Sequence, residues 1–221
     1  MKPLVVALAK GRLSDSAMEL LCRAGVVPDD LASAIKKRSR RLIFESRERG
    51  IGFFMAKPSD VPTYVEYGAA DIGIAGKDAL LESGRNLYEM LDLGFGSCRM
   101  IVAGREASRE LVARGNNFRV ATKYPRIALD YFVRRKQQSV EIIKLGGSVE
   151  LAPIVGLSDV IVDIVETGGT LRENGLVVLE EIAPISARMV VNRASMKIEH
   201  ARIVELIKMI KAVLGKNECD E

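Results

Sequence analysis

The sequence predicts an α/β protein made of two α/β lobes. Short apolar runs typical of strands, such as Leu4–Ala9 and Val160–Val165, alternate along the chain with segments of helical periodicity. Hydrophobic residues make up 48% of the 221 residues, whereas aromatic residues make up 5% and Trp is absent. The core must therefore be built from Val, Ile, Leu and Ala, a composition that favours a parallel sheet covered by helices on both faces.

The first part of the chain contains four of these apolar runs. They predict strands at residues 4–9, 42–45, 51–55 and 71–75. A helix is predicted to start at Ser14 or Asp15, because both residue types cap helices well, and to end at Gly25. Two shorter helices are predicted, one starting at residues 59–62 with Pro62 in its first turn and one over residues 77–82.

The second part of the chain shows the same alternation. Strands are predicted twice within residues 91–104 and then at residues 119–122, 140–144, 160–165, 176–182 and 187–191. Helices are predicted at residues 125–136, 151–157 and 199–214. The last of these is strongly amphipathic, because its apolar residues fall on one helical face: Ile203, Leu206, Ile207 and Ile210.

This repetition predicts two lobes, with the second inserted into the first. Lobe I is expected to comprise residues 1–93 and 176–221, and lobe II residues 94–175. A cleft between two such lobes would be the natural ligand site.

Charge and cysteine usage narrow the function classes. The net charge of +4 and the pI near 9.0 suit nucleic acid, a membrane surface or phosphorylated small molecules. The chain lacks the interleaved aromatic and basic residues typical of single-strand binders, and no apolar run is long enough to cross a bilayer. Cys22, Cys98 and Cys219 lack metal or disulfide spacing. We therefore expect a cytoplasmic protein with free thiols and neither a nucleic-acid nor a membrane partner.

The most informative motif is VIVDIVETGGTLRENG at residues 160–175. An apolar strand ends in two carboxylates, Asp163 and Glu166, and passes into Thr167-Gly168-Gly169-Thr170. Glycines allow a close backbone approach, and successive N–H groups at a helix start form an anion cradle. The two carboxylates fit a ligand that also brings hydroxyl donors or a metal, such as phosphoribosyl diphosphate with Mg²⁺. The alternative is a plain strand-to-helix turn, in which Thr caps the helix.

Two basic segments are weaker signals. Lys10-Gly11-Arg12 follows the first strand, where ligands of open α/β sheets bind, although it also fits an ordinary surface turn. The run at residues 36–41 suits a solvated or nucleic-acid face, yet its last two residues, Arg40 and Arg41, directly precede an apolar strand and at least one can point into a cleft. The single histidine, His200, is expected to be structural or solvated.

Several blocks in the chain resemble the ATP phosphoribosyltransferase family. They are ELAPIVGLSDVIVDIVETGGTL at residues 150–171, LAKGRL, SRRLIF, PSDVPTYVEYGAADIGIAGKD and IKLGGSVELAP, in the family's order. The resemblance implies two α/β lobes similar to type II periplasmic binding proteins, with the ligand cleft between them. It also implies the short form of the family, as a homodimer of catalytic subunits within a hetero-oligomer with a histidyl-tRNA-synthetase-like regulatory subunit.

The resemblance also implies roles for individual residues. Phosphoribosyl diphosphate would be bound by Asp163, Glu166, Thr167, Gly168, Gly169, Thr170 and Leu171. ATP would be bound by Lys10, Gly11, Lys57 and Asp71, although many family members carry Arg where this chain has Lys57. The catalytic cations would be Arg12 and Arg40, with Arg41 as the alternative to Arg40.

The implied reaction transfers the 5-phosphoribosyl group of phosphoribosyl diphosphate to N1 of the ATP adenine. Pyrophosphate leaves with inversion, and the step opens L-histidine biosynthesis. Mg²⁺ would arrive with the substrate, and no metal ligand is assigned on the protein. Positioning and fixed charge would be the main sources of rate enhancement.

Three other readings of the sequence remain open at this stage. A nucleobase-salvage phosphoribosyltransferase would share the acidic segment and the TGGT loop, but it would not need the KGR and GAADIGIAGKD blocks. A non-catalytic solute-binding module would normally carry a signal peptide, which the start of this chain does not resemble. A nucleic-acid binder rests only on the basic run and the pI.

Overall fold

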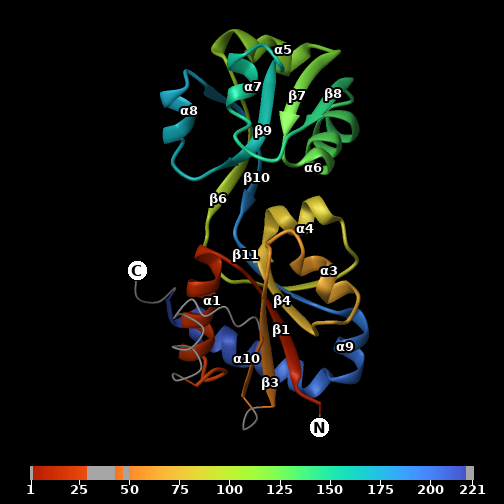
Figure 1. Ribbon diagram of the computed structural model, residues 1–221, viewed down its shortest axis with the longest axis vertical. Coiled ribbons are helices and arrows are strands. Elements are labelled where there is room, and N and C mark those ends of the chain that lie inside the picture. The colour runs from red at the N-terminus through yellow and green to blue at the C-terminus, as the bar shows by residue number, and fades with distance from the viewer. Residues whose placement is uncertain (1, 29–42, 47–49, 218–221) are drawn as a thin grey trace. The chain divides into compact units, whose positions relative to one another are not determined.

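The computed structural model describes residues 2–28, 43–46 and 50–217 (Figure 1). It divides into two compact units, each with its own sheet. Unit 1 comprises Met1–Gly96 and Ser186–Glu221, and unit 2 comprises Ser97–Ile185, so the second unit is inserted into the first. Among the described residues, no helix has the length and apolar character needed to cross a membrane.

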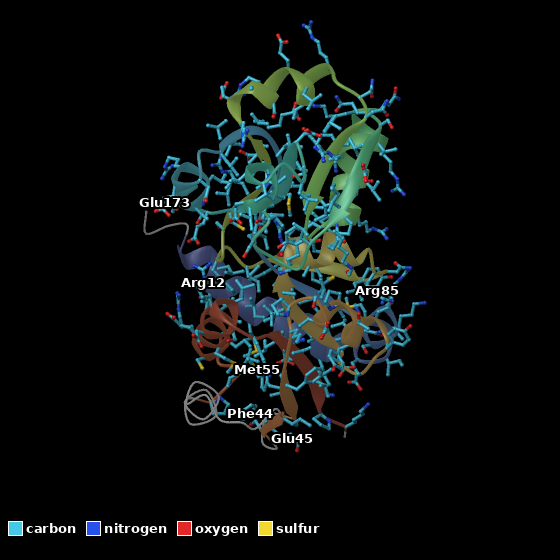
Figure 2. The ribbon with its side chains drawn as sticks, turned by 45° about the horizontal axis from the view of Figure 1, so that its top comes forward. Arg12, Phe44, Glu45, Met55, Arg85 and Glu173 are labelled. Atoms are coloured by element: carbon cyan, nitrogen blue, oxygen red, sulfur yellow. The ribbon has the colours of Figure 1, made fainter. Side chains whose placement is uncertain are left out.

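The described part of unit 1 contains a six-stranded mixed sheet in the order β2-β3-β1-β4-β11-β5. The strands are β1 (Leu4–Ala9), β2 (Ile43–Ser46), β3 (Ile51–Ala56), β4 (Ile72–Gly76), β5 (Tyr88–Asp92) and β11 (Ala187–Val191). The central strand β1 is parallel to β3 and β4, whereas β2, β11 and β5 pair antiparallel to their neighbours. Figure 2 labels Phe44 and Glu45 on the edge strand β2, where the first is buried and the second is exposed.

Helices cover both faces of this sheet. They are α1 (Arg12–Arg23), α3 (Val61–Glu66), α4 (Lys77–Ser83), α9 (Arg193–Ile198) and α10 (His200–Asn217). Alternate residues of β1 face opposite sides, because side chains of a strand alternate. Leu4, Val6 and Leu8 pack in one cluster with the apolar faces of α1 and α10, while Ala7 and Ala9 pack with α3 on the other side.

The described residues of unit 2 form a five-stranded mixed sheet in the order β10-β6-β9-β7-β8. Its strands are β6 (Cys98–Gly104), β7 (Phe118–Thr122), β8 (Val140–Lys144), β9 (Val160–Val165) and β10 (Val177–Ile185). Its helical segments are η1 (Glu106–Ser108), α5 (Arg109–Arg114), α6 (Pro125–Leu129), η2 (Asp130–Arg135), α7 (Leu151–Ile154) and α8 (Gly169–Glu173). The strand β9 is parallel to β7 and antiparallel to β6.

Most predicted elements are present, and the differences have local causes. Both sheets are mixed, so the expectation of a parallel sheet is wrong, because β2, β5, β6, β10 and β11 run antiparallel to their neighbours. The helix α1 begins at Arg12 after Gly11, and Ser14 lies inside its first turn, where its Oγ donates to the carbonyl of Gly11 at 2.6 Å. The predicted helix at 125–136 changes from α to π geometry at Asp130. The sequence does not predict the short helices α5 and α9, whereas α8 is the helix expected after the TGGT loop.

The observed units differ from the expected lobes in the strand β10. The sequence places residues 176–221 in lobe I, whereas β10 belongs to unit 2. The reason is its long antiparallel pairing with β6, which runs from Val177 opposite Gly104 to Ile185 opposite Cys98.

Candidate active site

The motif at residues 160–175 forms a strand, a loop and a short helix. The strand β9 ends at Val165, and α8 starts at Gly169. Gly168 precedes the helix with φ 73° and ψ 14°, a left-handed backbone conformation that residues other than Gly rarely adopt. The loop borders a pocket of about 220 Å³, lined by Ile101, Glu150, Asp163, Ile164, Val165, Glu166, Thr167, Gly168, Gly169, Thr170 and Leu171. All seven predicted phosphoribosyl diphosphate residues therefore lie around one pocket.

The loop backbone is the natural anion-binding part of this pocket. The first N–H groups of a helix have no partner within the helix, so those of Gly169 and Thr170 are available for an anion. The helix α8 itself has only five residues, so its dipole adds little. The cradle must therefore come from the individual N–H groups and the exposed hydroxyls of Thr167 and Thr170.

Three carboxylates border the same pocket. Asp163 is half-buried on β9, and one of its oxygens accepts the backbone N–H of Ile164 at 2.9 Å. Glu166 is exposed in the loop. Glu150, half-buried just before α7, also lines the pocket, although its sequence context predicts no role for it. The signal that points to it is topological, since its loop follows β8, whose carboxyl end lies at the same sheet edge as that of β9.

A buried hydroxyl holds the middle of β9, just before the residues of that strand that line the pocket. Thr122, the last residue of β7, is fully buried, and its Oγ1 donates to the carbonyl of Val162 at 2.6 Å. The same oxygen accepts the N–H of Tyr124 at 2.8 Å. Thr122 therefore ties two parallel strands together one residue before Asp163.

The second set of predicted residues meets at the sheet edge of unit 1. Lys10, Gly11 and Arg12 follow the carboxyl end of β1, and Lys57 follows that of β3. The N–H of Lys10 donates to the carbonyl of Ala56 at 2.8 Å, which continues the pairing of the two strands. Gly11 has φ 110°, and Figure 2 labels Arg12 where α1 begins. The side chains of Lys10, Arg12 and Lys57 are all exposed at this edge.

A comparison with protein families identifies the family to which this fold belongs. The family model described as HisG, ATP phosphoribosyltransferase, matches residues 57–212, which is more than half of the chain. The chain belongs to the ATP phosphoribosyltransferase family. As a member of this family it is a transferase that acts on ATP at the first step of histidine biosynthesis.

Sequence identity to individual relatives supports this assignment. ATP phosphoribosyltransferases from Lachnoclostridium phytofermentans and Lachnospira eligens are 59% and 60% identical to this chain over 214 and 211 residues. These matches cover 97% and 96% of this chain and 98% and 96% of the relatives.

Solved structures support the fold. The ATP phosphoribosyltransferase complex (HisG:HisZ) from Thermotoga maritima has a TM-score of 0.79 at 38% identity, covering 96% of this chain and 99% of that one. A more distant structure, Tv2483 bound to L-arginine, has a TM-score of 0.59 at 14% identity, covering 98% and 86% of the two chains, and resembles this protein in fold alone. The expected fold class of two α/β lobes is confirmed.

One residue expected to bind ATP in this phosphoribosyltransferase lies elsewhere. Asp71 precedes β4, so it is at the amino edge of the parallel strands, opposite Lys10 and Lys57. One carboxylate oxygen accepts the N–H of Val5 at 2.8 Å, and the other accepts the hydroxyl of Ser195 at 2.6 Å. This geometry favours a structural role for Asp71 in joining β1, β4 and α9. Arg40 and Arg41 lie outside the described residues.

The donor set of the phosphoribosyltransferase pocket fits a magnesium ion that arrives with a substrate. Among the described residues, no group of three or more His, Cys, Asp or Glu side chains has the geometry of a metal site. The carboxylates that do border the pocket, Asp163, Glu166 and Glu150, are oxygen ligands of the kind that Mg²⁺ prefers. Because Mg²⁺ keeps several waters and binds through substrate phosphates, one or two of these oxygens would be enough.

Proposed function

We propose that the pocket of unit 2 binds the 5-phosphate and ribose of phosphoribosyl diphosphate. The observation that carries the proposal is the loop itself, in which left-handed Gly168 and the start of α8 bring consecutive N–H groups to one pocket. Thr167 and Thr170 add hydroxyl donors to the phosphate. Asp163 and Glu150 line the remaining wall and would accept the ribose hydroxyls.

The exposed cations of unit 1 would bind the phosphates of ATP. Lys10, Arg12 and Lys57 stand at the carboxyl edge of β1 and β3, the edge at which open α/β sheets bind ligands. Gly11 lets the backbone turn there without a side chain that would fill the approach. The chain contains no Walker loop, so this edge offers a different mode of triphosphate binding.

The proposed chemistry is attack of adenine N1 on the anomeric carbon of the ribosyl group. The bond to pyrophosphate breaks, the ribosyl centre becomes cationic, and the leaving group takes the electron pair. The protein's residues align the two substrates and hold negative charge on pyrophosphate, which is the role proposed for Arg12 and Arg40. Mg²⁺ carried by the substrate would supply additional charge neutralisation, with Glu166 as the pocket carboxylate left to contact it.

The partner is also part of this proposal. The Thermotoga relative was solved as a complex of two different proteins, HisG and HisZ. We propose that this chain likewise works as a homodimer of catalytic subunits together with a histidyl-tRNA-synthetase-like regulatory subunit.

The decisive experiment replaces Gly168 by Val. A β-branched residue is strained in the left-handed conformation of Gly168. Its Cβ would already lie 3.6 Å from Nη1 of Arg172 and 3.7 Å from Cγ2 of Val165, before the two methyl groups are added. The KM for phosphoribosyl diphosphate should rise by at least about tenfold, because hydrogen bonds to a charged phosphate are lost, whereas the KM for ATP should change little. Initial rates with each substrate varied in turn measure both constants.

A control variant separates the effect of blocking the pocket from the effect of straining a left-handed backbone. Gly175 also has positive φ, at 67°, but a Cβ there meets nothing within 4 Å, and it lies outside the pocket. Gly175→Ala should lower stability through the strained backbone and leave both KM values unchanged. Equal increases in both KM values for a folded Gly168→Val enzyme would refute the assignment of this loop.

A further inference from the structure

The guanidinium of Arg172 lies against the phosphate loop from outside the pocket. Its Nη1 donates to the carbonyl of Thr167 at 3.2 Å. The same nitrogen is 3.6 Å from the place where a Cβ on Gly168 would stand. Arg172 belongs to α8, and its side chain reaches back toward the start of that helix, as helical side chains do. The contact therefore joins the helix to the loop that precedes it.

This hydrogen bond determines how one peptide group is oriented. The peptide between Thr167 and Gly168 is trans, so its C=O and N–H point in opposite directions. Since the Thr167 carbonyl faces Arg172, the Gly168 N–H faces away from Arg172. The described residues that line the pocket include Thr167 and Gly168 but not Arg172. The carbonyl thus faces a residue that does not line the pocket, and we infer that the opposite N–H faces the pocket.

We propose that Arg172 is a positioning residue for the 5-phosphate of phosphoribosyl diphosphate. A carbonyl oxygen turned toward the pocket would repel a phosphate, while an N–H in the same place would bind it. By holding the Thr167 carbonyl, Arg172 keeps the peptide in the orientation that binds an anion. Gly168 contributes the left-handed backbone, and Arg172 contributes the direction of the peptide plane. This inference rests on the function proposed for the loop.

A second explanation would be that Arg172 acts only as a nearby positive charge. The two explanations differ in their response to salt. Long-range attraction between exposed charges is largely screened at roughly 0.5 M salt, whereas the orientation of a peptide group is not. Arg172 is exposed, so the overall fold should tolerate its replacement.

The experiment compares Arg172→Met and Arg172→Gln with a control on the same helix. Glu173, labelled in Figure 2, is the exposed neighbour of Arg172, and Glu173→Gln also changes the charge of α8 by one. The probe is ribose 5-phosphate as a competitive inhibitor, together with the KM for each substrate, at low salt and at about 0.5 M salt. Arg172→Met should raise the inhibition constant and the KM for phosphoribosyl diphosphate by about tenfold at both salt concentrations. The KM for ATP should stay within about twofold, and Glu173→Gln should behave as wild type.

Several outcomes would overturn the positioning role. They are a wild-type inhibition constant in both Arg172 variants, an effect that disappears at high salt, and an equal effect on ATP. The Gly168→Val enzyme separates this inference from the function of the loop. If Gly168→Val raises the KM for phosphoribosyl diphosphate and the Arg172 variants do not, only the positioning role of Arg172 is refuted. If Gly168→Val leaves that KM unchanged, the assignment of the loop to the 5-phosphate is refuted as well.

Discussion

Neighbouring residues at the sheet edge of unit 1 have different proposed roles. Gly11 and Arg12 are adjacent, yet the role proposed for Gly11 depends on its backbone and the role proposed for Arg12 depends on its charge. Gly11, two residues after the end of β1, has φ 110° and immediately precedes α1, which begins at Arg12. This places a permanently charged guanidinium, which can form a planar two-point contact, at the edge proposed for ATP phosphates and departing pyrophosphate.

Arg12→Ala should lower the turnover number more than it raises either KM. A cation that acts on departing pyrophosphate interacts most strongly after negative charge has developed there. Removing one such contact costs roughly 10²–10³ in rate, and Arg12→Lys should recover only part of it. Single-turnover chemistry at saturating substrates measures the effect. A wild-type chemical rate in Arg12→Ala would exclude the catalytic role, even if binding were weaker.

For Asp71 we expect a loss of stability and no loss of catalysis, the reverse of the expectation for Arg12. Both of its carboxylate oxygens accept hydrogen bonds, from Val5 and from Ser195. Asp71→Asn replaces the charged acceptor of these two hydrogen bonds with a neutral amide, so the free energy of unfolding should fall by about 1–3 kcal/mol. The KM for ATP should remain near wild type if the role is structural. Urea unfolding and ATP kinetics together decide it, because a stable variant with a raised KM for ATP would restore Asp71 to the ATP site.

At the scale of elements, the pocket depends on how β9 is held between its neighbours. β9 is antiparallel to β6 and parallel to β7, and its last residues carry Asp163 to the pocket. The strand β10 extends the same sheet beyond β6 and is tied to η2 by a side-chain cluster. Lys136 and Tyr131 both donate to Glu180, and burial together with the bond to Glu180 raises the pKa of Tyr131 to about 12.

Thr122→Val should weaken both the fold and the binding of phosphoribosyl diphosphate. The change keeps the shape of the side chain but removes the hydroxyl that bonds the Val162 carbonyl and the Tyr124 N–H, at a cost of about 1–3 kcal/mol. The end of β9 should then shift, and the KM for phosphoribosyl diphosphate should rise more than that for ATP. Thr122→Ser keeps the hydroxyl and serves as the control in urea unfolding and kinetics. Equal stabilities for the Val and Ser variants would contradict this role of the hydroxyl.

At the scale of the whole molecule, the proposed association with a regulatory subunit can be tested directly. If the chain works as part of a hetero-oligomer, mixing it with a histidyl-tRNA-synthetase-like protein should produce a larger species in size-exclusion chromatography. The turnover number of the mixture should differ from that of the chain alone. A partner that binds one conformation of the chain more tightly increases the population of that conformation. A catalytic chain that neither associates at roughly micromolar concentrations nor changes its rate would contradict this partnership.

Local sequence was sufficient for most individual elements and for the part of the pocket lining that the loop after β9 supplies. β1, β8 and β9 have the bounds expected from their apolar runs, because a buried strand flanked by polar and glycine residues is a local signal. The residues 163–171 meet at one pocket for a similar reason, since a strand end, a loop and the next helix are covalently adjacent. The family blocks also named the reaction, which the comparisons confirm.

The tertiary structure decided what depends on pairing between distant segments. Strand direction is one case, since apolar runs look alike whether β11 lies parallel or antiparallel to β4. The place of Asp71 is another, because its partners Val5 and Ser195 are 66 and 124 residues away in sequence. Glu150 joins the pocket through the neighbouring loop after β8, and Arg172 acts through the direction of a peptide group. Residue type and spacing carry no information on such orientations, which arise only when the sheet and its loops are assembled in three dimensions.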